Sequence, residues 1–553
     1  MKFVQMTSSN HKHLRGNSAT AKLLSLVLVA VFAISLFSIF CVRSIFARDT
    51  RTVLAKTTKS HSAASLSADP TGCKECHQAE VEGFERSAMG NALRVAGREP
   101  IGSVETPDAR ITVESSAAGT WQVLDSHGVQ RKFHVAYVIG SGLHARGYLV
   151  DIGSHLFQSP IAYYVGRHAY GLAPGYEKEV DPDFTRPVTP ACLFCHSGEA
   201  AHVPGTINEY QSRVTSIGCA RCHGSLAAHL ADPGPGNIVN PAKLPAAARG
   251  AVCEQCHLFG AARVLNPGHS LNDFHAGQKL ESTLTIYRNV LPPGTAGSFK
   301  VISQAEELSL SMCARKSGGK LWCGTCHNPH ETPADPVAYY RAKCLVCHNT
   351  GFPASHPGVH SNCIGCHMPT REVSNGGHTA FTDHRIQIRP EPRIAITDET
   401  GIAAWREPAP ALRERNLGIA DIQVGVERGS STFIIRGYRL LTQVQTEFPK
   451  DSDLYTWMGT ALLMGRQYSE AERAFQVALD LDPNSDIKQA NAGRAYASAG
   501  DFDKAKPYLE RALQLDPLDL ETASLLIKID KSQGNLAEAA QISSRTRRAM
   551  QMH

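Results

Sequence analysis

Hydrophobic and polar residues follow three different patterns along this chain of 553 residues. Near the N-terminus, residues 23–42 form an uncharged apolar run that is long enough to span a bilayer as a helix. In residues 110–116 and 121–140, apolar and polar residues alternate around a Ser-His-Gly turn, which predicts a small antiparallel β element. From residue 418 onward, small residues recur at a much longer interval.

That interval is 34 residues, and it defines a helical repeat. Positions one period apart carry the same residue, as in Ala471, Ala505 and Ala539, Gly459 and Gly493, and Pro483 and Pro517. Four units, the first of them degenerate, fill residues 418–553, and "WMGTALLMGRQYSEAERAFQVALDLDP" resembles the tetratricopeptide consensus. We expect an α-solenoid whose concave face binds a protein. A passive helical appendage that packs on the preceding domain is the alternative.

The apolar run predicts the topology of the N-terminus. Four basic residues precede the run, so residues 1–22 are expected to stay in the cytoplasm, with 23–42 as a transmembrane anchor and 43–68 as a linker. A cleavable signal peptide that ends at "IFA" before Arg48 is the alternative. Under both interpretations, the rest of the chain is exported from the cytoplasm. We therefore expect the protein on the periplasmic side of the inner membrane, or free in the periplasm if cleaved.

The composition limits which partners and cofactors are expected for this chain. A net charge of +5 without a Lys/Arg tract argues against a nucleic-acid partner. The chain has 16 cysteines and 25 histidines, and 14 of the cysteines belong to seven copies of Cys-x-x-Cys-His. The seven motifs are Cys73–Cys76–His77, Cys192–Cys195–His196, Cys219–Cys222–His223, Cys253–Cys256–His257, Cys323–Cys326–His327, Cys344–Cys347–His348 and Cys363–Cys366–His367.

The motif spacing suits covalent attachment of haem. Cysteines three apart on a helical turn face the same way, so each can form a thioether to one haem vinyl group while the next histidine ligates the iron. A zinc ribbon does not need a histidine after every cysteine pair, and a thioredoxin-type dithiol needs one pair. We therefore expect seven covalent haems c. Successive motifs are so close that the macrocycles must form much of the core of a heptahaem domain over 69–386, followed by a linker at 387–417.

The sixth ligands of the irons are expected among the other histidines. The better placed candidates are His144, His229, His330, His360 and His384, and His378 and His275 come next. The first motif has no histidine close behind it, so Met89 or the distant His144 is expected to serve that haem. A histidine with a surface or hydrogen-bonding role is the alternative for each position.

Residues 69–553 resemble a family of exported bacterial multihaem cytochromes c with C-terminal tetratricopeptide repeats. The resemblance depends on "CHNPH", "CHMP", "HTAFTDHRI", "GSGLHARGYL" and the repeats. The haem region is also similar to the lineage of tetrahaem carriers, pentahaem nitrite reductase and octahaem hydroxylamine oxidoreductase. The resemblance implies stacked haem pairs with mostly bis-histidine irons, and thus electron transfer. The Cys-x-x-Cys-Lys motif of the nitrite reductases is absent, which argues against that reaction.

Together these features predict a mainly α protein, in which a haem-packed, loop-rich domain with a small β element precedes a solenoid. We expect a periplasmic electron carrier whose repeats dock a redox partner protein, with the N-terminal helix in the inner membrane. The alternative is a multihaem oxidoreductase that acts on a small nitrogen or sulfur compound at one five-coordinate haem. An electron carrier is favoured over an enzyme, so no catalytic residue is expected.

Overall fold

The computed structural model describes residues 70–551, except 214, 293, 298–300, 303, 351, 353, 355, 374–375, 377–378, 389–390 and 393. The expected cytoplasmic segment, anchor and linker over residues 1–68 lie outside the described residues, as does His378. The prediction of a membrane-anchored location is contradicted. Within the described part of the chain, no helix has the length and apolar character needed to cross a bilayer.

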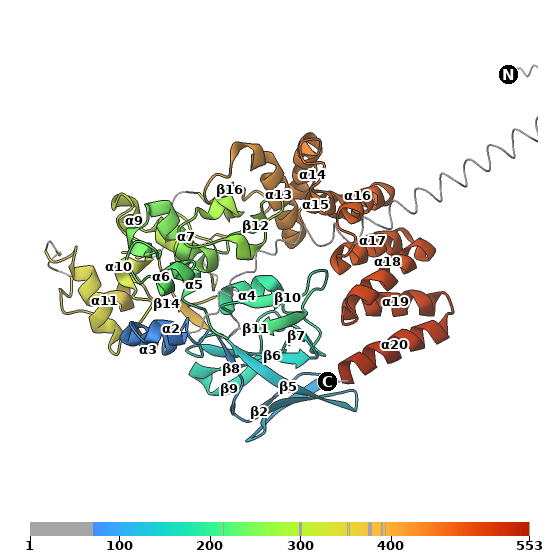
Figure 1. The fold of residues 1–553 in the computed structure, drawn as a ribbon, viewed down its shortest axis with the longest axis horizontal. Coiled ribbons are helices and arrows are strands. Elements are labelled where there is room, and N and C mark those ends of the chain that lie inside the picture. Colours follow the sequence, from blue (N-terminus) through green and yellow to red (C-terminus); the bar gives the residue numbers. More distant parts are fainter. Residues whose placement is uncertain are drawn as a thin grey trace, which may run out of the picture. The chain divides into compact units, whose positions relative to one another are not determined.

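An antiparallel sheet of nine strands follows the first motif, so the prediction of a small β element was wrong in extent (Figure 1). The strands run β2-β3-β4-β5-β6-β8-β9, while β1 pairs with β5 and β7 pairs with β6. Their bounds are β1 Leu93–Val95, β2 Gly102–Glu105, β3 Ala109–Ser116, β4 Gly119–Ser126, β5 Val129–Ile139, β6 Ala145–Ile152, β7 His155–Gln158, β8 Ile161–Tyr164 and β9 Ala169–Leu172.

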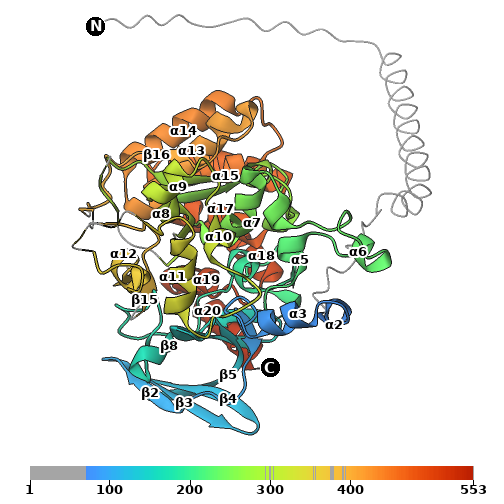
Figure 2. The same cartoon turned by 90° about the vertical axis from the view of Figure 1, so that its left-hand side faces the viewer.

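The sheet curls until its two edge strands lie beside each other. The hydroxyl of Tyr170 on β9 donates a hydrogen bond of 2.7 Å to the carbonyl of Pro100, and its ring packs against Gly102 at the start of β2. Strands β3 and β4 bury every second residue, as expected for strands with one face toward a core. In Figure 2, β2, β3, β4 and β5 lie side by side as neighbouring strands at the bottom of the view.

The motif region consists of short helices and small sheets. Its helices are α2 Pro70–Lys74, α3 Gln78–Glu85, α4 Pro190–His196, α5 Ala220–His223, α6 Ala227–Ala231, α7 Ala246–His257, α8 Gln304–Leu310, α9 Met312–Lys316, α10 Cys323–Cys326, α11 Pro336–Leu345 and α12 Cys363–His367. Its sheets are β10 Ala200–His202 with β11 Tyr210–Arg213, β12 Ala262–Leu265 with β13 Leu284–Asn289 and β16 Ile402–Ala404, and β14 Thr370–Glu372 with β15 Ala380–Thr382. Strand β16 falls inside the range that was predicted to be a linker.

The predicted C-terminal helical repeat region is confirmed (Figure 1). Its helices are α13 Arg413–Arg428, α14 Ser431–Val444, α15 Ser452–Met464, α16 Tyr468–Leu481, α17 Asp486–Ala499, α18 Phe502–Leu515, α19 Leu520–Ser532 and α20 Leu536–Gln551. Side chains of Asp451, Ser485, Asp501 and Asp519 cap the N-termini of α15, α17, α18 and α19. These polar residues between apolar helical stretches explain where the helices begin.

The first repeat helix packs on the motif region. The Arg415 side chain on α13 is 1% exposed and donates two hydrogen bonds to Asp451, at 2.8 and 3.1 Å, and another to the carbonyl of Leu265 on β12. Residues of β12 and β13 share one hydrophobic cluster with α13 to α16. The solenoid is therefore joined to the motif region by a continuous core.

The inter-repeat loops make a second contact, with the β-sheet region. His155 Nε2 lies 3.0 Å from Asp516 Oδ1, and the Ile207 amide donates to Asp516 Oδ2 at 3.0 Å. The Asp486 amide donates to the carbonyl of Gly205 at 2.9 Å. The repeats thus contact the rest of the chain at two separate places.

Candidate functional site

Each of four motifs forms one helical turn in which the histidine amide returns to the first cysteine. The amide nitrogens of His77, His223, His327 and His348 donate to the carbonyls of Cys73, Cys219, Cys323 and Cys344 at 2.8 to 3.0 Å. This i to i−4 bond places the first cysteine and the histidine on the same side of the turn. The local sequence therefore presents thiol and imidazole side chains to one space.

Four motif histidines face a second histidine from elsewhere in the chain. The pairs and their ring-centroid separations are His77–His229 at 6.3 Å, His223–His330 at 6.0 Å, His327–His384 at 6.1 Å and His367–His356 at 6.2 Å. Bonds of about 2 Å from each imidazole to one iron would set the ligating nitrogens about 4 Å apart, and half a ring on each side accounts for the remainder. The separation thus suits one iron between two imidazoles.

Hydrogen bonds to Nδ1 orient most of these rings. The Nδ1 atoms of His223, His229 and His384 lie 2.8 to 3.0 Å from the carbonyls of Val239, Gly234 and Thr382. Metal-ligating histidines usually donate Nδ1–H to a carbonyl, which fixes the tautomer and leaves Nε2 for the metal. His367 Nδ1 has the same relation to the Gln387 carbonyl at 3.0 Å, and His327 Nδ1 lies 3.1 Å from the Tyr340 hydroxyl.

Burial keeps several of these imidazoles neutral. Loss of water around His327, together with nearby His384 and His257, lowers the pKa of His327 to about 4. Burial likewise lowers the pKa of His330 and of His384. A neutral imidazole is the form that binds a metal, so these positions require no deprotonation at neutral pH.

The motifs lie against one another. Thiols of different motifs lie close enough to influence each other's pKa in four pairs, which are Cys73–Cys219, Cys195–Cys256, Cys253–Cys323 and Cys344–Cys363. Cys326 is also close enough to Cys347 for electrostatic interaction. With the His223–His330 pair, these contacts connect all seven motifs into one array.

Several attachment helices have no residue buried by the polypeptide itself. Helices α5, α10, α11 and α12 bury none of their residues. Val346, inside the sixth motif, is 78% exposed although it is a large apolar residue. Short helices without a buried face need another apolar partner to be stable. A porphyrin against each turn fits this surface, and the donor set of two thiols and an imidazole fits haem c.

Two predicted distal ligands are not paired in this way. The His144 ring lies 4.9 Å from the ring of Phe381, and the carbonyl of His360 accepts a hydrogen bond from Arg341. His356, four residues before His360, faces His367 instead. His229, rather than Met89, is the residue opposite His77. Distance along the chain to the next motif favoured His360 over His356, whereas His356 is the histidine that faces His367 in the structure.

Three motif histidines have a different environment. Among the described residues, no second histidine ring pairs with His196, His257 or His348. Burial lowers the pKa of both His196 and His257, which also lie near each other. The Nδ1 atom of His196 is 3.3 Å from the carbonyl of Ala92. The second and fourth motifs thus combine an enclosed proximal histidine with no opposing imidazole in the described part of the chain.

Two segments match known families. Residues 173–224, which contain the second and third motifs, match the family described as cytochrome c554 and c-prime. Residues 496–552 match the tetratricopeptide repeat family. These matches indicate a c-type cytochrome with a repeat region of the kind that mediates protein interaction. No curated protein matches the chain.

Solved structures similar to this chain include several of MamA. "MamA MSR-1 C2" is 19% identical over 26% of this chain and 79% of that chain, with a TM-score of 0.23. "MamA 41-end from Desulfovibrio magneticus RS-1" is 18% identical over 26% of this chain and 81% of that chain, also with a TM-score of 0.23.

Proposed function

We propose that each of the seven motifs carries a covalent haem c and that the protein transfers electrons along the resulting array. The observation that carries this proposal is the set of four histidine pairs with ring separations of 6.0 to 6.3 Å. Each pair joins one motif histidine to a histidine outside the motifs. That spacing would suit two imidazole ligands on one iron, which is what the resemblance to the multihaem lineage implies.

The side chains have distinct roles in this proposal. The paired cysteines of each motif hold the macrocycle, the motif histidine is the proximal ligand, and His229, His330, His384 and His356 are distal ligands. When bound, haem c supplies a one-electron couple whose potential depends on axial ligands and burial. With haem bound, the two imidazoles of each pair would both be held as ligands of the iron and would leave no position for a substrate, which would favour outer-sphere electron transfer. The Nδ1 hydrogen bonds orient the rings of His223, His229, His384 and His367 and would limit their movement during electron transfer.

Contacts between motifs define the route for electrons. The Cys73–Cys219 contact connects motif one to motif three, and the His223–His330 pair connects motif three to motif five. The contacts Cys195–Cys256 and Cys253–Cys323 add motifs two and four to motif five. The Cys326–Cys347 contact connects motif five to motif six, and the Cys344–Cys363 contact connects motif six to motif seven. The branched array offers more than one point of entry, and the tetratricopeptide repeats are proposed to dock the redox partner protein.

Intact mass and paramagnetic resonance test this function together. The purified protein should show the mass of seven haems and a haem stain that survives denaturation, with low-spin signals from the paired irons. A mass excess of six haems or fewer would refute the count. Low-spin signals absent from the four paired sites would refute the ligand assignment.

A second function concerns the motifs whose histidine has no opposing imidazole among the described residues. His196 and His257 are buried proximal ligands in this proposal, and an iron on either could keep one axial position open for a small nitrogen or sulfur compound. Titration with nitrite, hydroxylamine and cyanide distinguishes the two functions. Binding and turnover at a high-spin haem would favour the oxidoreductase, whereas no spectral response would leave electron transfer as the function.

A further inference from the structure

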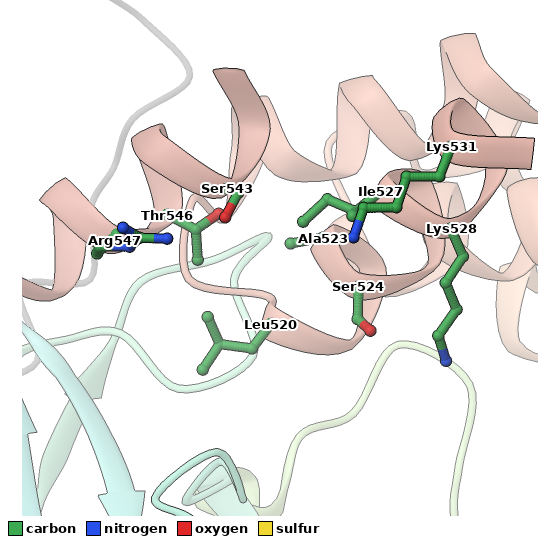
Figure 3. A pocket seen from close by; sticks show the side chains of 9 residues that line it. All are labelled: Leu520, Ala523, Ser524, Ile527, Lys528, Lys531, Ser543, Thr546 and Arg547. Carbon is green, nitrogen blue, oxygen red and sulfur yellow. The ribbon is translucent and has the colours of Figure 1, made fainter. Parts of the chain in front are cut away.

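A groove separates the last two helices of the solenoid. It has a volume of about 340 Å³ and lies between α19 and α20, which pack less extensively against each other than the earlier helix pairs do (Figure 3). The residues that line it are Leu520, Ala523, Ser524, Ile527, Lys528, Lys531, Ser543, Thr546 and Arg547. Its floor is apolar and its rim carries three cations.

The groove coincides with a change in the repeat sequence. In the second and third repeats, Gly459 and Gly493 stand where the two helices cross. A Cβ at Gly459 would lie 2.7 Å from the Phe475 ring, and one at Gly493 would lie 2.6 Å from the Leu509 side chain. The residue one period later is Ile527. The larger Ile527 is only partly compensated by Ser543, which stands where the third repeat has Leu509, and α20 packs less extensively on α19 than α18 does on α17.

The 34-residue spacing also shows that the second helix of the last repeat has polar residues where the second helix of the third repeat has leucines. In the third repeat, Leu509 and Leu513 pack on the following helix α19 in one hydrophobic cluster. The equivalent positions 34 residues later are Ser543 and Arg547. The face that holds the next apolar helix in an earlier repeat is therefore polar and basic in the last one. A further repeat of the same kind would bury Arg547 against apolar side chains, which is unfavourable.

The rim cations are available to a partner. Among the described residues, Lys528, Lys531 and Arg547 form no ion pair, and all three are exposed. The neighbouring carboxylates are engaged elsewhere, because Glu538 pairs with Lys506 and Glu521 with Arg494. A second copy in a two-fold arrangement would set these like charges opposite each other. An acidic ligand, in contrast, would neutralise them.

We infer that this groove binds an acidic amphipathic helix of a partner protein. Apolar residues of that helix would contact Leu520, Ala523 and Ile527, and its carboxylates would pair with Lys528, Lys531 and Arg547. Two antiparallel helices with a gap between them accept a third helix in the manner of solenoid stacking. The helix would belong to the protein that is proposed to dock on the repeats, so this inference rests on the proposed docking role.

The test measures binding of the holoprotein to a labelled synthetic helix of three heptads, with leucine at positions a and d and glutamate at e and g. The Glu peptide should bind, and a peptide with lysine in place of every glutamate should not. Lys528→Glu combined with Lys531→Glu should weaken binding at least about tenfold. Ile527→Gly, which restores the close crossing, should weaken it as well. Arg439→Glu with Lys450→Glu, two exposed cations elsewhere on the solenoid, is the matched control and should bind as the wild type does.

Equal binding of the two peptides, or unchanged binding by the Lys528→Glu/Lys531→Glu variant, would overturn the inference. A variant that loses binding to vesicles of phosphatidylglycerol while peptide binding is unchanged would also overturn it, in favour of a membrane surface. Haem content and the visible spectrum are recorded on the same samples. If the protein carried seven haems but did not bind the peptide, only the inferred role of the groove would be refuted. If haems were missing while the peptide bound, only the proposed haem content would be refuted.

Discussion

His223 and His330 face each other with ring centroids 6.0 Å apart and planes inclined by 14°, although His223 belongs to the third Cys-x-x-Cys-His motif and His330 follows the fifth. Hydrogen bonds hold both sides of this pair: His223 Nδ1 lies 2.8 Å from the Val239 carbonyl, and the His330 backbone amide donates to the Asn328 side-chain oxygen Oδ1 at 3.1 Å. A histidine that follows the fifth motif thus faces the histidine of the third motif. This relationship makes the third and fifth motifs parts of a single unit.

His330→Ala should convert one haem from low-spin to high-spin. The variant removes the imidazole opposite His223 and opens an axial position, but it leaves every cysteine and proximal histidine in place. Intact mass should still show seven haems, and paramagnetic resonance should show one new high-spin signal. His269→Ala, at an exposed histidine outside the candidate ligands, is the control and should leave the spectrum unchanged. An unchanged spectrum in His330→Ala would show that His223 takes another sixth ligand.

Arg415→Met should destabilise the junction between the solenoid and the motif region by about 3–5 kcal/mol, because it leaves the buried Asp451 carboxylate without its partner. Thermal unfolding, followed by circular dichroism of the holoprotein, measures the change. Asp451 also caps α15, so that helix should show faster hydrogen exchange.

Arg413→Met is the matched control for this junction. Arg413 is exposed and lies 3.6 Å from the exposed Glu407, an arrangement worth about 0–1 kcal/mol. If Arg413→Met and Arg415→Met lowered stability equally, the buried ion pair would not be what holds the junction together.

The Asp486 carboxyl should make the second solenoid contact sensitive to pH. It is 1% exposed, and both of its oxygens lack a hydrogen-bond partner among the described residues. Burial, with Asp516 and Asp519 nearby, raises the pKa of Asp486 from 3.8 to about 7. The folded chain therefore holds this proton where the unfolded chain releases it. The stabilisation is complete below about pH 4 and is lost as the pH rises through 7.

Asp486→Asn should therefore raise the thermal midpoint by a few degrees at pH 8 and by less than half as much at pH 5, because at pH 5 only part of the stabilisation has been lost. Comparing variant and wild type at each pH removes the opposite contribution of His202, since burial lowers the pKa of that histidine. Glu510→Gln, an exposed site on α18, is the control and should give no difference at either pH. Equal stabilisation by Asp486→Asn at both pH values would contradict the assigned protonation.

Gly493→Ile should open a second gap in the solenoid. A Cβ at this position already lies 2.6 Å from Leu509, so an isoleucine forces α17 and α18 apart at a cost of about 1–3 kcal/mol. Ser498→Ile places the same residue on an exposed site of the same helix and should cost less. Denaturant unfolding compares the two. If Gly493→Ile lowered the free energy of unfolding less than Ser498→Ile does, the close packing of α17 and α18 would not depend on glycine at position 493.

The local features of this protein could be predicted from the sequence. A Cys-x-x-Cys-His turn is set by five neighbouring residues, and a 34-residue repeat depends on positions that recur along the chain. The partner of each motif histidine could not be predicted, because His229 and His330 reach His77 and His223 only after the chain has folded. Sequence distance carries no information about such contacts.

The extent of the sheet was underestimated for a related reason. Strands β7 and β8 bury nearly every residue, with the patterns of His155–Gln158 and Ile161–Tyr164 showing no alternation. A strand covered on both faces lacks the period of two by which exposed strands are recognised. Only β3, β4 and β5 had that signal, and they are the part of the sheet that the sequence predicted.

Chain produced without haem attachment should lose the motif region while keeping the repeats. Helices α5, α10, α11 and α12 bury no residue of their own, so no apolar contact within the polypeptide replaces a missing macrocycle. Helices α13 to α18 have buried residues in every helix, and those cores need no cofactor. Expression in a host without haem maturation, followed by limited proteolysis, should leave a resistant helical fragment that begins near residue 413. A protease-resistant fragment that contains the seven motifs would show that the polypeptide folds there without haem.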